Sequence, residues 1–153
     1  MKTKMESKEL RIGNLIYKEI PSINATKEIV EVLSIDDSFY VLDVKNSEGY
    51  ITEECFLDIF QPIPLTEEWL VKFGFIKGIE KGIYGNVYKF GHNDCNYVLS
   101  RDWREEASYH LGIEYTDSPY EEDDGKIYNF SFKVMYVHQL QNLWFTLIHK
   151  ELK

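Results

Sequence analysis

His92 and Cys95 flank Asn93 and Asp94, and this tetrapeptide has the residue types most able to do chemistry. An imidazole and a thiol three positions apart could supply two zinc ligands, or a nucleophile with its base. A structural zinc site needs four ligands. The other candidates stand far away, at spacings that match no zinc motif: Cys55, His110, His138 and His149. A tight turn favours Asn and Asp and explains the segment more simply, so we expect no metal and no cofactor.

A second set of polar side chains falls on one face of a predicted C-terminal helix. His138 and Asn142 are four residues apart and therefore neighbours on a helix. His149 lies about 16 Å further along, which is too far to share a ligand with His138. We expect a solvent-exposed polar face here, or a histidine that supplies hydrogen bonds at a helix N-terminus without a Ser, Thr or Asp cap. We also interpret His138, Asn142 and His149 as a candidate interaction surface.

The acidic run Glu121, Glu122, Asp123 and Asp124 precedes Gly125 and could indicate calcium. Aligning Gly125 with the invariant glycine of an EF-hand places a tyrosine and a serine where that loop requires carboxylates, so the motif fails. A solvated loop is the expected structure. The four carboxylates form the second candidate interaction surface, which would attract a basic partner.

Charge is unevenly distributed along the 153 residues. The chain carries 17 basic and 26 acidic residues, a net charge of −9, and residues 28–64 contain nine acidic residues and one basic residue. Such a surface repels phosphate backbones, so direct nucleic-acid binding is disfavoured. No apolar run is long enough for a membrane span, and no secretory signal opens the sequence. We therefore expect a cytoplasmic protein that does not contact membranes, with Cys55 and Cys95 reduced.

The N-terminal third predicts short strands. Residues 1–9 are polar and are expected to be a disordered tail, and residues 10–61 a β-rich module. In it, 29–35 and 39–44 read as a hairpin and 50–52 as a short strand. Residues 52–59 suggest a helical turn. The expected fold of this module is a small SH3-like barrel or a curled sheet.

Residues 62–153 predict an α+β module. Pro62 and Pro64 form a stiff connector, and Thr66 begins a helix that ends near Gly74. Hairpin strands should follow on either side of residues 91–94. Strict alternation in 109–115 and 127–136 predicts two antiparallel strands joined by the acidic loop. The final helix, about 137–149, carries a stripe expected to pack on this meander: Leu140, Leu143, Trp144 and Leu147.

Three segments together resemble a group of short proteins of uncharacterised role from phages, prophages and mobile elements of Bacteroidetes. The segments are Leu10-Arg-Ile-Gly-Asn14, Pro62-Ile-Pro-Leu-Thr66 with the Glu-Trp-Leu helix after it, and Tyr136-Val-His-Gln-Leu-Gln-Asn-Leu143. The ending after Leu143 departs from the group. The resemblance implies a bacterial or phage setting and carries no activity.

The sequence contains no phosphate-binding glycine loop, metalloprotease helix or hydrolase nucleophile motif. We therefore expect a non-enzymatic binding or accessory protein of a phage or mobile element, acting through protein contacts. It could also be an acidic mimic of nucleic acid that occupies a DNA-binding protein's site. The alternative is a small hydrolase or transferase that uses His92, Asp94 and Cys95. The sequence does not identify the partner or the oligomeric state.

Overall fold

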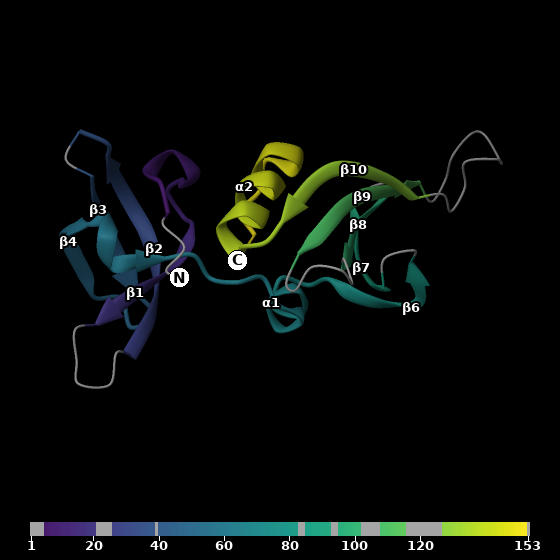
Figure 1. Cartoon of the computed structure of the whole chain (residues 1–153), viewed down its shortest axis with the longest axis horizontal. Coiled ribbons are helices and arrows are strands. Elements are labelled where there is room, and N and C mark those ends of the chain that lie inside the picture. The colour runs from purple at the N-terminus through teal and green to yellow at the C-terminus, as the bar shows by residue number, and fades with distance from the viewer. Residues whose placement is uncertain are drawn as a thin grey trace. The chain divides into compact units, whose positions relative to one another are not determined.

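The computed structural model describes residues 5–20, 26–38, 40–82, 85–92, 95–101, 108–115 and 127–152. The chain divides into two compact units, each built on an antiparallel sheet (Figure 1). Unit 1 contains Met1–Pro64 and Tyr136–Leu152, and unit 2 contains Leu65–Met135. The chain therefore passes between the units twice, at residues 64–65 and 135–136. The predicted α+β class with antiparallel sheets is confirmed.

Unit 1 holds a five-stranded sheet with the strand order β4-β3-β2-β1-β5. Its strands are β1 Leu15–Ile20, β2 Thr26–Asp36, β3 Val41–Asn46, β4 Ile51–Phe56 and β5 Phe60–Gln61, with the short 3₁₀ turns η1 Ser7–Glu9 and η2 Leu57–Ile59. The predicted hairpin is β2 and β3, and the predicted helical turn is β4 followed by η2. Neither sheet closes on itself within the described residues, so the SH3-like barrel form is not confirmed.

One apolar cluster forms the core of this sheet. Alternate side chains of the strands point inward, as the pleat of a strand requires. Ile16, Val30 and Val32 from β1 and β2 are fully buried, as are Leu42 and Val44 from β3. Met5 and Leu10 join the same cluster. Within the expected disordered tail, residues 1–9, the structure places the buried Met5 and the turn η1.

Unit 2 holds a five-stranded meander with the order β10-β9-β8-β7-β6. Its strands are β6 Ile76–Gly82, β7 Gly85–His92, β8 Cys95–Arg101, β9 Tyr109–Tyr115 and β10 Ile127–Val134. Tyr128 pairs with Ile113, and Val134 with Tyr109, so the predicted antiparallel pairing across the acidic loop is confirmed. The structure adds β6, one strand more than the pattern predicted.

The helix α1, Glu67–Lys72, begins and ends where the sequence predicted. Thr66 is its N-cap residue, and Gly74 has a φ of 87°, a left-handed conformation that glycine adopts without steric cost. The Gly74 N–H donates to the Val71 carbonyl and the Phe75 N–H to the Leu70 carbonyl, which is the Schellman arrangement. This turn brings Phe75 against Phe90 of β7, with ring centroids 5.4 Å apart.

The helix α2, Val137–Ile148, belongs to unit 1 and contacts β1. The sequence predicts that this helix packs on the meander, whereas the structure groups it with the sheet of unit 1. Its buried face consists of Val137, His138, Leu140, Gln141 and Trp144. Compared with the predicted stripe, this face is rotated by roughly a quarter turn, so that Leu147 is exposed and two polar residues are buried.

Candidate functional site

The first sequence candidate, around Cys95, lies mostly outside the described residues. His92 and Cys95 are opposite each other in the β7–β8 register, which confirms the hairpin. Residues 93 and 94 are not described, and neither is the side chain of His92. Cys95 is half-buried.

The second candidate separates into residues with different environments. Glu121, Glu122, Asp123 and Asp124 lie outside the described residues. His149 is exposed and ends α2 in a left-handed conformation, with a φ of 58°. Asn142 is half-buried and its side chain is bonded on both sides, to Asn14 and to the Glu9 carbonyl. Of the two histidines on the predicted helix face, only His149 is exposed.

His138 is buried, with 1% of its surface exposed, which contradicts the expectation that it faces solvent. Neither ring nitrogen has a hydrogen-bond partner. The ring stacks on Tyr136, with centroids 5.8 Å apart and planes 6° apart. Burial opposes the charged form and lowers the pKa of His138 to about 4, while Glu9 acts weakly in the other direction. His138 is therefore a neutral interior side chain at neutral pH.

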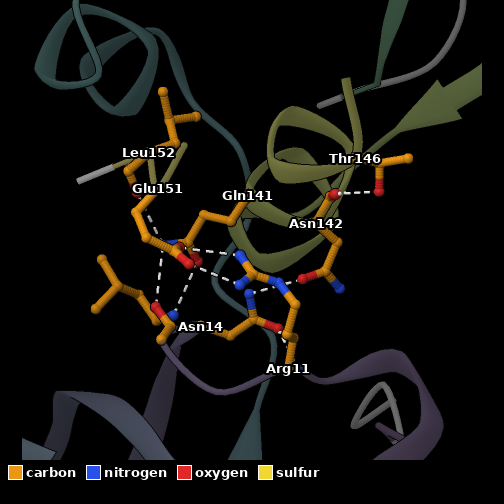
Figure 2. Close-up of polar contacts among 9 residues, drawn as sticks. Arg11, Asn14, Gln141, Asn142, Thr146, Glu151 and Leu152 are labelled. Carbon is orange, nitrogen blue, oxygen red and sulfur yellow. Dashed lines mark hydrogen bonds and ion pairs between the residues drawn. The ribbon is translucent and has the colours of Figure 1, made fainter. Parts of the chain in front are cut away.

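Two amides that the sequence analysis did not single out connect α2 to the start of β1 (Figure 2). Gln141 Oε1 accepts from the Leu15 N–H at 2.9 Å, and its Nε2 donates to the Leu152 carbonyl at 3.1 Å. Asn14 Nδ2 donates to Asn142 Oδ1 at 2.8 Å. Gln141 follows Val137 by four residues and therefore lies beside it on the helical wheel, and this position is the sequence signal for its burial.

A bidentate ion pair lies at the edge of the same network (Figure 2). Arg11 contacts the two Glu151 oxygens at 2.7 and 2.9 Å, and its guanidinium lies 4.0 Å from the centre of the Phe145 ring. Both side chains are partly exposed, so the pair contributes at most about 1 kcal/mol to stability. Its fixed geometry orients the end of the chain, where the buried Leu152 packs into unit 1.

Unit 1 contains residues from each of three segments: Leu10–Asn14, Pro62–Thr66 and Tyr136–Leu143. The first supplies Arg11 and Asn14, and the last supplies Gln141 and Asn142. The middle segment supplies Ile63, whose carbonyl accepts from the Val137 N–H at 2.9 Å. These contacts join α2 to the residues before β1 and after β5.

Unit 2 contains a compact charged cluster on one sheet face. Glu114 of β9 is buried, and its two oxygens accept from Lys89 Nζ at 2.6 Å and from Asn96 Nδ2 at 2.8 Å. Burial alone would raise the pKa of Glu114, but these two donors outweigh it and the net shift is downward. The cluster is internally satisfied and therefore stabilises the register of three strands.

The most exposed apolar side chains of unit 1 gather along β4. The exposed fractions are 59% for Ile51 and 66% for Phe56 within the strand, and 69% for Tyr50 and 64% for Tyr40 beside it. Phe56 pairs with Val41, the residue after Tyr40, and Tyr50 directly precedes Ile51. We call these four residues the β4 surface: Tyr40, Tyr50, Ile51 and Phe56.

Acidic side chains are close to the β4 surface in sequence, and the cation of Lys18 reaches the same strand, where its Nζ donates to Thr52 Oγ1 at 3.0 Å. Glu53 and Glu54 are exposed on β4 itself, Glu48 precedes the strand and Asp58 follows it. β4 is also the last strand of its sheet, so one of its backbone edges has no strand beside it in the described part of the chain. An edge strand with large apolar side chains is a template for pairing with another chain.

The described residues contain no group of three or more His, Cys, Asp or Glu side chains that could hold a metal ion. Within the same residues, neither helix has the length and apolar character needed to cross a membrane. Comparisons with protein-family models, curated proteins and solved structures return no match.

Proposed function

We propose that this protein is a non-enzymatic binding protein that acts through protein–protein contacts made by the β4 surface. One observation carries the proposal: four large apolar side chains are mostly exposed along a single open edge strand. Single exposed apolar residues are ordinary on protein surfaces, but several large ones on and beside one edge strand favour an interaction site. Tyrosine and phenylalanine are also enriched among residues that dominate binding energy.

The charge of this region selects the partner. Exposed carboxylates at Asp36, Asp37, Glu48, Glu53 and Glu54 belong to the segment with the strongest negative charge. A basic protein surface complements it and would associate faster at low salt. In the nucleic-acid-mimic form of this proposal, the partner is a DNA-binding protein, and duplex DNA competes for the same partner surface. The resemblance to phage and mobile-element proteins supports an accessory role in such an element.

Affinity capture from an extract of the native host tests the proposal, with quantitative mass spectrometry of the bound proteins. Phe56→Lys should abolish capture of the partner, because it removes an exposed aromatic and reverses the local charge preference. The matched control is Ile76→Lys, which makes the same kind of change at an exposed apolar residue of unit 2. Both variants should melt like the wild type. Equal capture by both variants would refute the role of the β4 surface.

A further inference from the structure

We infer that the β4 edge binds a basic, extended segment of a partner by strand addition. This inference rests on the proposed function and specifies how the β4 surface recognises its partner. Strand addition uses main-chain hydrogen bonds for affinity and alternate side chains for specificity.

The phase of the β3–β4 ladder determines which backbone groups of β4 face the open edge. Asn46 N–H donates to the Tyr50 carbonyl at 3.0 Å, and Leu57 N–H donates to the Tyr40 carbonyl at 2.9 Å. Tyr50 and Leu57 therefore direct these groups toward β3. Residues in an antiparallel strand alternate between the two edges. Ile51, next to Tyr50, consequently directs its N–H and carbonyl groups outward. Phe56, next to Leu57, directs its N–H outward, whereas its carbonyl belongs to the N-cap of η2.

A bulge divides this edge into two short pairing sites. Leu42 pairs with Cys55 and Val44 with Thr52, so Glu53 and Glu54 together oppose Asp43. Glu54 has a φ of 52°, and its N–H donates to Asp43 Oδ1 at 2.9 Å. Bulges of this kind prevent a long, regular edge from pairing indiscriminately. A partner strand can bind at Ile51 and at Phe56, where the outward groups are accompanied by exposed apolar side chains.

Charge distinguishes between the possible occupants of the edge. A second copy of this chain would bring Glu53 and Glu54 against the same residues, and like charges across a strand pair are unfavourable. A segment that alternates Lys or Arg with Val or Ile would instead place its cations beside these carboxylates and its apolar side chains against Ile51 and Phe56. The occupant that fits is therefore a basic β-strand of another protein.

The probe is a capped eight-residue peptide that alternates Lys and Val, titrated into the ¹⁵N-labelled full-length protein. The largest amide shifts should occur at Ile51 and Phe56. Two further peptides carry backbone N-methyl groups, one on its four Lys residues and the other on its four Val residues. One set should weaken binding at least about tenfold, because it removes the donors that face β4, and the other set should leave affinity within about twofold. A Glu–Val peptide should not bind.

Equal effects of the two N-methyl sets, or shifts located away from β4, would overturn strand addition. The protein is unchanged in these comparisons, so a folding defect cannot produce either result. The two proposals fail separately. Loss of partner capture by Phe56→Lys with equal N-methyl effects retains the binding function and removes strand addition. Unchanged capture by Phe56→Lys refutes the proposed function, and strand addition as its mechanism fails with it.

Discussion

His138 is the residue at which the helical period gave the wrong environment. The sequence places it with Asn142 on a polar face, whereas the structure buries it without a hydrogen-bond partner. An unsatisfied buried polar group typically costs 1–3 kcal/mol, so this histidine lowers the stability of unit 1 in exchange for no visible bond. Its neutrality makes that cost dependent on pH.

The unfolded chain protonates His138 near pH 6.5, while the folded protein resists protonation until about pH 4. Protonation of His138 in the unfolded chain therefore leaves the free energy of unfolding unchanged above pH 6.5. As pH falls from 6.5 toward 4, it lowers the free energy of unfolding by about 3 kcal/mol in total. His138→Leu should remove this decline and cost less than about 1 kcal/mol at pH 7, because it also removes the unsatisfied nitrogens.

Urea unfolding of the wild type and of His138→Leu from pH 4 to 7.5 measures the difference between their free energies of unfolding. The carboxylates are the same in both proteins, so their titration cancels in this difference. The control is His149→Asn, which removes an exposed histidine and keeps a residue that tolerates positive φ. A wild-type profile parallel to that of His138→Leu would show that the ring is not held neutral.

Asp43 links three strands through its two oxygens. Ser34 Oγ donates to it at 2.6 Å and the Glu54 N–H at 2.9 Å, and the Ser34 bond contributes most to lowering the pKa of Asp43. A carboxylate with a lowered folded pKa stabilises the protein above its unfolded pKa, near 3.8, and loses this effect as pH falls below it.

Asp43→Ala should therefore lower the melting temperature at pH 7, and the difference from wild type should shrink below pH 3, where Asp43 itself becomes protonated. Asp58→Ala, an exposed carboxylate in the same unit, should melt like wild type at both values. Thermal melts by circular dichroism at the two pH values provide the comparison. A difference that is the same at both would exclude the charged form as the source of the stabilisation.

At the scale of elements, α2 is the decisive case. Amphipathicity predicted a helix and its approximate bounds correctly, but the direction of its buried face depended on which sheet it packs against. Trp144 is 3% exposed, whereas Leu147 of the predicted stripe is 37% exposed. Gln141 lies on that face, beside Val137, and its amide supplies hydrogen-bond partners to backbone groups of Leu15 and Leu152.

Trp144→Ala should destabilise the protein by about 3–5 kcal/mol, because a large buried aromatic leaves a cavity in unit 1. Leu147→Ala should cost less than about 1 kcal/mol, although both residues belong to the stripe predicted from sequence. Chemical denaturation of the two variants measures the contrast. Similar losses would show that the helix is oriented as its periodicity suggested rather than as the structure places it.

At the scale of the whole molecule, the chain forms two units that each complete their own core. The N-terminal sheet needs α2 from the far end of the sequence, so the chain must leave unit 1, build unit 2 and return. The cores do not share strands within the described residues, because the two five-stranded sheets are separate. We therefore expect each unit to open as its own cooperative block.

Ile16→Ala in unit 1 and Leu99→Ala in unit 2 remove comparable, fully buried side chains. Each should cost about 2–5 kcal/mol and accelerate amide hydrogen exchange in its own sheet, leaving the other sheet nearly unchanged. Hydrogen exchange followed by mass spectrometry separates the two sheets, and each variant is the control for the other. Acceleration in both sheets by either variant would show that the units open together.

Local patterns in the sequence determined most of the elements: the capped α1, the β7–β8 hairpin, the alternating β9 and β10, and the existence of α2. These depend on turn chemistry and on periods of two or 3.6 residues, which act between near neighbours. Tertiary structure alone decided that α2 joins the first sheet, that His138 and Gln141 are buried, and that β4 is an open edge. These features depend on residues far apart in the chain, through contacts such as Asn14 with Asn142 and Arg11 with Glu151. A local period of two or 3.6 residues carries no information about such contacts.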